Sequence, residues 1–188
     1  MAFLSTLWLP ILLSAVFVFL ASSAIHMALK WHNVEYRHLP EEDAVRAAFQ
    51  QAGAAPGQYV LPWCMDPKER ESEATRRKYQ EGPVALVWLM PNGLPNMGKS
   101  LGLWFLFNLV LAFCVAYVAA HVLPTGPHLY LKVFRVVGTI AFLAHGMGQV
   151  SGSIWMGKPW SATAKDLLDS LIYALLTAGT FGWLWPSS

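Results

Sequence analysis

The chain has 188 residues, of which 55% are hydrophobic and only 13% are charged, whereas a soluble domain carries about 25% charged residues. A chain this apolar cannot cover itself in water, which excludes an ordinary soluble globular protein. The formal net charge of +2 is too small to indicate a nucleic-acid partner.

Charge is confined to two parts of the chain. All eleven acidic residues and eleven of the thirteen basic residues fall in segments 30–99 and 158–169, and the rest is almost free of charge. This separation predicts an integral membrane protein whose long apolar segments lie in the lipid bilayer.

The first apolar stretch runs from about Phe3 to Leu29 and ends at Lys30. A helix needs about 20 apolar residues to cross the hydrocarbon core of a bilayer. The stretch has no basic residue at its start, and it is longer than the ~7–15-residue core of a cleaved signal peptide. We interpret it as the first membrane helix.

Residues 30–100 form a polar region with local structure of its own. Pro40 and the three acids that follow it are typical of a first helical turn, and Gly53 is typical of a helix end. A second charged helix is predicted over 68–80, and 84–90 indicates a strand or an interfacial segment. The region is too small to bury a core easily, so we expect it to pack on the membrane helices or against lipid headgroups.

Residues 93–100 read GLPNMGKS, which matches the phosphate-binding pattern G-x-x-x-x-G-K-[ST]. That pattern functions in a water-facing loop between a buried parallel strand and a soluble helix. Here the next helix is apolar enough for a membrane, and Pro95 lacks an amide donor. We interpret the segment as a turn with Lys99 at the membrane interface, and nucleotide binding is not expected.

Three further apolar stretches follow, and tryptophans lie near several of their ends, as in interfacial aromatic belts. The fold class predicted is therefore an all-α membrane protein, a four-transmembrane-helix bundle with a polar loop region of roughly 70 residues between helices 1 and 2. The corresponding division is 1–29, 30–100 and 101–188. The last three spans are predicted at Leu101–Leu123, Val136–Met156 and Leu167–Trp185.

Polar residues recur at helical spacing within the spans. Because polar groups face lipid only at high cost, these residues should face one another inside the bundle. Asp169 and His26 are expected to pair at the mouth of a polar cavity. The candidate intramembrane site consists of His26, Asn108, His145, Gln149, Asp169 and Tyr173.

The same residues have a purely structural interpretation, which stays open. Polar side chains and small residues hold membrane helices together. Gly148 and Gly152 are spaced for close contact with the fourth span, and Asp166 with Thr163 resembles a capping box.

No metal site, cofactor or set of catalytic residues is predicted. His26, His32 and His38 recur every six residues, which does not place them on one α-helical face. His26, His121 and His145 lie at different depths, so no pair suits a haem. The spacings typical of protein metal sites are missing.

Four segments resemble an uncharacterised family of bacterial inner-membrane proteins with no assigned activity. The resemblance implies a multi-pass protein of the bacterial inner membrane, and it carries over no catalytic residues. The segments are SSAIHM (22–27), GPVALVWLMPNGLPNMGKSL (82–101), SIWMGKPWS (153–161) and LLTAGTFGWLWP (175–186).

Three functions are compatible with this sequence. The first is a non-enzymatic scaffold, assembly factor or accessory component, with the lipid bilayer and either a second copy or another membrane protein as partners. The second is a bundle that handles a small solute or protons through the candidate site. The third is a membrane-interface enzyme acting on a lipid or quinone, with His26 and Asp169 as acid and base.

Overall fold

The computed structural model describes residues 2–187, and nearly all of its regular structure is helical. The chain divides into two compact units. The helical unit comprises the chain up to Arg37 and from Asn96 onward, and the insert unit comprises His38–Pro95. Each unit is described by itself.

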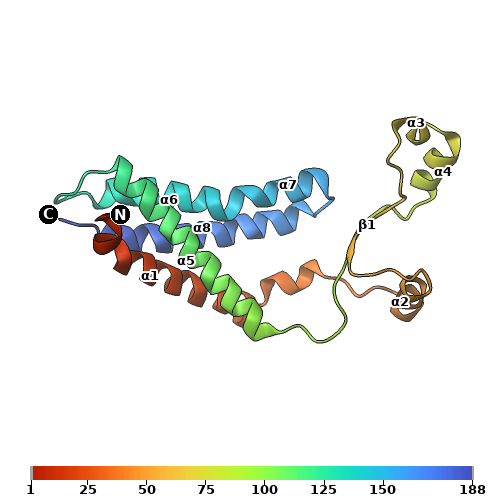
Figure 1. Ribbon diagram of the computed structural model, residues 1–188, viewed down its shortest axis with the longest axis horizontal. Helices are drawn as coiled ribbons and strands as arrows, with labels where there is room; N and C mark the ends of the chain where they lie inside the picture. Colours follow the sequence, from red (N-terminus) through yellow and green to blue (C-terminus); the bar gives the residue numbers. More distant parts are fainter. Residues whose placement is uncertain (1, 188) are drawn as a thin grey trace. The chain divides into compact units, whose positions relative to one another are not determined.

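The helical unit contains long, nearly continuous helices. Its elements are α1 (Ala2–Ser23) continued by the π-helix η1 (Ala24–Leu29), the 3₁₀-helix η2 (Trp31–Glu35), α5 (Met97–Val122), α6 (Tyr130–Phe142) continued by the π-helix η3 (Leu143–Met147) and α7 (Gly148–Trp155), and α8 (Trp160–Trp183). α8 runs back beside α6 and α7, so that α1 begins and α8 ends at the same end of the unit (Figure 1).

Three of these helices are long and apolar enough to cross a membrane, namely Leu4–Leu29, Met97–Val122 and Tyr130–Trp155, with 26 residues each. At ~1.5 Å per residue, such a helix is about 39 Å long, which exceeds the ~30 Å hydrocarbon core. The first three predicted spans are therefore confirmed as helices suited to a membrane.

The prediction of a fourth span of the same kind is not confirmed. α8 is a 24-residue helix and is long enough, but its composition is not apolar enough to qualify it as a membrane helix beside the other three. Lys165, Asp166 and Asp169 in its first half, together with several hydroxyl and glycine residues, lower its hydropathy. The polar residues that lower the hydropathy of α8 lie largely on its buried face, which packs against α1 and α6.

An apolar core fills one part of the helical unit. Close approach of α6 and η3 to α8 depends on two glycines, because a Cβ on Gly138 would lie 3.2 Å from Ala178 Cβ and one on Gly146 would lie 3.0 Å from Ser170 Cβ. The core includes Leu7, Ile11, Leu111, Val115, Ala116, Ala119, Val133, Val137, Ala141, Ala178 and Phe181.

The expected contact of Gly148 and Gly152 with the last helix is wrong. A Cβ on Gly148 would meet no atom within 4 Å, and one on Gly152 would meet only the Lys158 side chain. The physical reason is the π-helix η3, whose wider turn shifts the helical phase by one residue, about 100°. Gly146 rather than Gly148 therefore faces α8.

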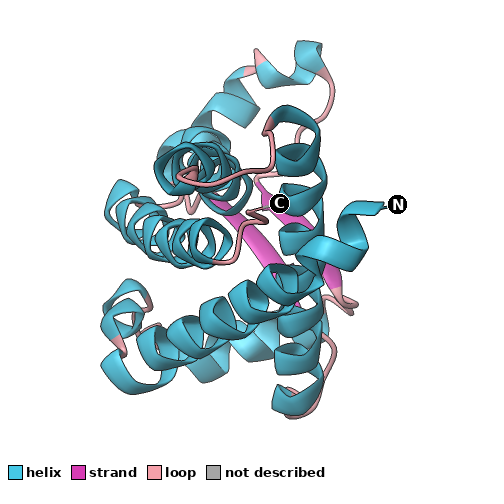
Figure 2. Cartoon of the chain, turned by 90° about the vertical axis from the view of Figure 1, so that its left-hand side faces the viewer, coloured by secondary structure: helices cyan, strands magenta, loops and turns pink. Residues whose placement is uncertain are grey.

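The insert unit contains the only sheet of the described residues, drawn in magenta in Figure 2. Strands β1 (Gly57–Leu61) and β2 (Ala85–Leu89) pair antiparallel, from Gly57 opposite Leu89 to Leu61 opposite Ala85. The remaining elements are α2 (Glu42–Gln51), α3 (Pro67–Arg70) and α4 (Glu73–Glu81).

The structure does not support the prediction of a single polar loop region over 30–100. Residues 30–37 and 96–100 belong to the helical unit, and 38–95 fold as a compact unit with a two-stranded sheet. Pro40 lies before the N-cap Glu41 rather than in the first helical turn. The single helix predicted over 68–80 is two helices, because the Ser72 side chain accepts the Thr75 amide hydrogen and starts α4 afresh.

Candidate functional site

The helical unit has a partly open cavity of about 650 Å³ among η1 with the end of α1, the start of α5, η3 with α7, and the first half of α8. Both π-helices contribute to its wall, and π-bulges inside α-helices occur frequently at functional sites. The lining residues include Ser22, His26, Met27, Met97, Leu101, Trp104, Phe107, His145, Gln149, Asp166, Asp169 and Tyr173.

Five of the six candidate site residues line this cavity, and one does not. His26, His145, Gln149, Asp169 and Tyr173 belong to its wall. Asn108 is buried in α5 instead, where its Nδ2 donates to the Trp104 carbonyl oxygen at 2.7 Å. Asn108 therefore fixes the helix that carries Trp104, while its Oδ1 has no partner among the described residues.

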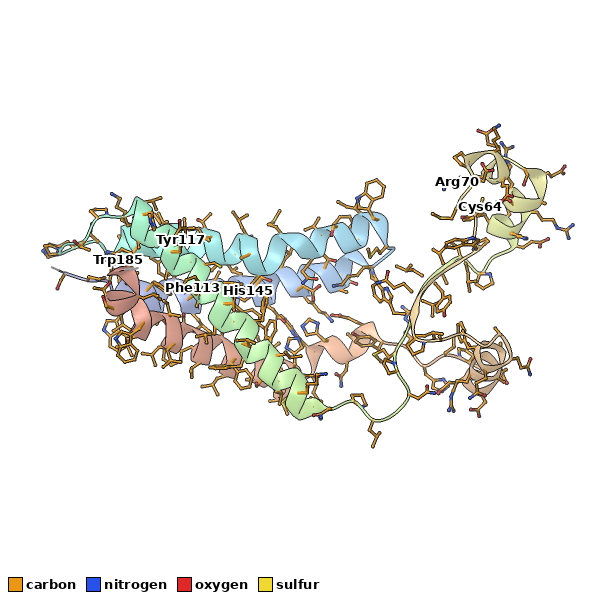
Figure 3. The ribbon with its side chains drawn as sticks, in the orientation of Figure 1. Cys64, Arg70, Phe113, Tyr117, His145 and Trp185 are labelled. Carbon is orange, nitrogen blue, oxygen red and sulfur yellow. The ribbon has the colours of Figure 1, made fainter. Side chains whose placement is uncertain are left out.

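The inner part of the cavity is aromatic. The His145 ring lies 5.4 Å from that of Tyr173, 6.0 Å from that of Phe107 and 6.5 Å from that of Trp104, between centroids. Trp104 Nε1 donates to Ser22 Oγ at 2.7 Å, which ties α5 to α1. Figure 3 shows His145 part of the way along the helical unit, away from the end where Trp185 lies.

At the polar end of the cavity, the carboxylate of Asp169 lies close to two histidine side chains. His32 Nε2 lies 2.9 Å and His26 Nε2 lies 3.8 Å from Asp169 Oδ2. The Asp169 side chain is only 5% exposed, and its Oδ1 has no partner among the described residues. The expected pairing of Asp169 with His26 is therefore present, with His32 closer still.

His32 is the residue that sequence reasoning missed. The six-residue spacing from His26 separates the two on a regular α-helix, but the backbone here is not regular. η1 is a π-helix, Lys30 takes a left-handed conformation with φ 52°, and η2 is a 3₁₀-helix. This path stacks the His26 and His32 rings 4.7 Å apart with planes 10° from parallel.

Around this histidine pair, acidic and basic side chains are paired with each other. His32 Nδ1 lies 2.8 Å from Glu35 Oε1, which in turn lies 3.3 Å from Lys165 Nζ. Lys165 Nζ also donates to the Trp31 carbonyl oxygen at 2.8 Å. Buried charges are tolerated when they are paired in this way.

The predicted capping box of Thr163 and Asp166 is wrong. α8 begins at Trp160, before Thr163. The Thr163 hydroxyl bonds the Ser153 hydroxyl at 2.6 Å, and Asp166 pairs with Lys158. These contacts instead link the two sides of the turn between α7 and α8.

The segment 93–100, which resembles a phosphate-binding loop in sequence, is organised as the start of a capped helix. Asn96 is the N-cap of α5, and its Oδ1 accepts the Lys99 amide hydrogen at 3.0 Å. An amide that a bound phosphate would need is therefore already used by the protein.

Comparisons of the chain with protein-family models, with curated proteins and with solved structures found no match. The resemblance to a bacterial inner-membrane family stays a prediction. Function is therefore inferred from the site itself.

Proposed function

We propose that the protein is a multi-pass protein of the bacterial inner membrane whose helical unit binds an amphipathic molecule, with a polar head and an acyl or isoprenoid body such as a lipid or quinone. The three membrane-suited helices support the membrane location.

We propose in addition that α8 spans the bilayer as a fourth helix. Its 24 residues correspond to about 36 Å, which is enough for the hydrocarbon core. Its buried residues include Asp169, Ser170, Tyr173, Thr177 and Thr180. Because these face other helices or the cavity, their low hydropathy does not carry the cost of exposure to lipid.

One observation carries the proposed ligand class, namely the mixed chemistry of the cavity wall. Large apolar side chains (Met27, Met97, Leu101) and aromatic rings line it together with Asp169 and His26. Small-molecule sites are typically 300–1,000 Å³ and mostly apolar with a few placed polar groups. A wall of this kind fits a molecule that has one polar end.

The polar end also offers groups for proton exchange with a ligand head. His26 Nδ1 lies 3.0 Å from the Ser22 carbonyl oxygen, so that Nδ1 is the donor and Nε2 faces Asp169. The two groups are 3.8 Å apart, so a quinone or lipid headgroup placed between them, within hydrogen-bond distance of each, can exchange a proton with either.

A path for protons or solutes across the whole bundle has less support. Beyond the cavity, the apolar core formed by residues such as Leu111, Val115, Val137 and Phe181 fills the space between the helices. The hydroxyls of Thr177 and Thr180 are already donated to carbonyl oxygens of their own helix. A transport path needs polar groups or water throughout.

Ligand binding is tested by placing a larger side chain in the cavity, at a position where the protein itself leaves space for it. Gly148 lines the cavity, and a Cβ added there would meet no atom within 4 Å. The same holds for Gly102 on α5, which lies outside the lining. Saturable binding of decylubiquinone and of a fluorescent phosphatidylglycerol is measured for purified wild type, Gly148→Leu and Gly102→Leu.

Wild type and Gly102→Leu are expected to bind one of the probes with equal affinity, and Gly148→Leu is expected to bind at least about tenfold more weakly, since a clash with a bound ligand costs more than ~1.4 kcal/mol. Equal affinities in all three proteins, or no saturable binding of either probe, would contradict the proposal.

A second candidate is the scaffold or accessory function expected from the sequence. The observation in its favour is that the insert unit exposes large apolar side chains, among them Trp63, Trp88 and Met90. Exposed apolar patches mark interaction sites. Multi-angle light scattering in mild detergent tests it, since a stable homo-oligomer would support a structural role and a monomer would not.

A further inference from the structure

We propose that His26, His32 and Asp169 form a binding site for a divalent transition-metal ion of the zinc or iron class. Each offers one ligand atom, and the three atoms all lie within 4.8 Å of one another. The inference goes beyond ligand binding in the cavity and does not depend on it.

The spacing of the ligand atoms suits such an ion. Bonds of about 2.0–2.1 Å in a tetrahedral site separate neighbouring ligand atoms by about 3.3 Å. Here Asp169 Oδ2 lies 2.9 Å from His32 Nε2 and 3.8 Å from His26 Nε2. These two distances differ from about 3.3 Å by about 0.4 Å and 0.5 Å.

The outer contacts of both histidines are those of metal ligands. A ligating histidine usually donates its second ring N–H to a carboxylate or a backbone carbonyl. His32 Nδ1 contacts Glu35 Oε1 at 2.8 Å, and His26 Nδ1 contacts the Ser22 carbonyl oxygen at 3.0 Å. Both contacts leave the Nε2 atoms aimed at the same carboxylate.

Asp169 supplies an independent indication of a ligand. Its side chain is 5% exposed, yet Oδ1 has no hydrogen-bond partner among the described residues. A buried carboxylate oxygen without a partner is costly, and an ion that Asp169 binds through both oxygens, Oδ1 as well as Oδ2, removes that cost. A cation also offsets the negative charge of Asp169 and Glu35, of which Glu35 pairs with Lys165.

Binding requires one movement. The rings of His26 and His32 are stacked almost parallel, whereas an ion must lie in the plane of each ring that binds it. The His26 side chain is 52% exposed, so it has room to turn out of the stack while Asp169 and His32 stay in place.

The composition of the site determines which ions it prefers. Two imidazole nitrogens and one carboxylate select Zn²⁺, Fe²⁺ and related ions, whereas Mg²⁺ and Ca²⁺ prefer oxygen ligands throughout. Three protein ligands leave a further coordination position, as in catalytic rather than structural zinc sites. Asp169 and His26 also line the cavity, so this position is next to it.

The experiment measures binding of Co²⁺ and Zn²⁺ to the full-length protein in detergent after chelator treatment. Co²⁺ reports its ligands through visible absorption, and Zn²⁺ is measured by competition. The variants are His26→Ala, His32→Ala and Glu35→Gln. The control is His38→Ala, which removes an exposed histidine of the insert unit. Mg²⁺ is the control ion.

Wild type and His38→Ala are expected to bind one Co²⁺ per chain, displaced by Zn²⁺ and unaffected by Mg²⁺. Loss of either His26 or His32 is expected to weaken binding by about 100-fold or more, and Glu35→Gln by about 10-fold with unchanged stoichiometry. His26 is half-exposed, so its variant tests binding without disturbing the core.

Two results would overturn the site. One is the absence of Co²⁺ binding by wild type at one ion per chain. The other is binding by His26→Ala and His32→Ala that equals that of His38→Ala, because bound ions would then lie elsewhere. Neither result bears on decylubiquinone or lipid binding, which is measured without added metal.

Discussion

The close packing of η3 on α8 predicts that adding one methyl group at Gly146 destabilises the helical unit. In Gly146→Ala, the new Cβ would lie 3.0 Å from Ser170 Cβ and 3.3 Å from Leu167 Cδ2, whereas carbon atoms pack at about 3.5–4.0 Å. α8 must then move away from η3 by several tenths of an ångström, and Ser170 and its neighbours on the cavity wall move with it.

The size of the effect follows from two opposing terms. Overpacking of this kind costs about 1–3 kcal/mol, and replacing glycine by alanine in a helix contributes up to about 1 kcal/mol in the opposite direction. Gly148→Ala is the matched control, because its Cβ would meet no atom within 4 Å and only the favourable term applies. The two variants should therefore differ by about 1–3 kcal/mol.

Thermal unfolding in detergent, followed by tryptophan fluorescence, measures this difference. At about 2–4 °C per kcal/mol for a chain of this size, Gly146→Ala should unfold roughly 2–12 °C below Gly148→Ala. Equal midpoints would refute the proposed close contact between η3 and α8, and with it the position of His145 and Tyr173 around the cavity.

Three further perturbations have expected outcomes. Trp104→Phe removes the donor to Ser22 Oγ and should lower the free energy of unfolding by about 1 kcal/mol, measured by chemical denaturation; no change would show that this bond does not link α5 to α1. Phe181→Ala empties a fully buried position and should cost about 3–5 kcal/mol in the same assay. Ser72→Ala removes the cap of α4, at a cost of about 1 kcal/mol. Amide hydrogen exchange over 73–81 should then accelerate roughly fivefold, while exchange in the helical unit should not change. Faster exchange in both units would contradict the division into independent units.

The membrane helices were predictable because their signal is local. Length and hydropathy are properties of a continuous segment, so three spans follow from the sequence with ends no more than six residues from those observed. α8 follows less completely, since whether Asp169 is costly in a membrane depends on which other helices its face meets. That information is not contained in the segment itself.

The site was predictable in part. Polar residues placed at similar depth, such as His26 and Asp169, do meet, because depth along a helix follows from simple counting. His32 escaped because its position depends on the left-handed backbone at Lys30 and on two non-α segments. No periodicity in the sequence predicts such a change in the direction of the backbone.

Irregular helical backbone also explains why the wrong glycine was assigned to the contact with the last helix. Assignment of Gly148 to the contact with the last helix assumed a regular α-helix through residues 138–152. The π-helix over Leu143–Met147 breaks that assumption and exchanges Gly148 for Gly146 at the contact. Faces of a long helix can be read from sequence only as far as the next irregular turn.

Photo-crosslinking in nanodiscs tests the occupied cavity most directly. A diazirine-bearing phospholipid and a diazirine-bearing quinone are each activated with and without an excess of the unlabelled molecule. We predict that one probe labels the cavity residues Met27, Met97 and Trp104 and that its competitor abolishes this labelling, while labelling of the exposed Leu106 and Val110 on α5 persists. Labelling of Leu106 and Val110 alone, or cavity labelling that excess competitor leaves unchanged for both probes, would contradict the account.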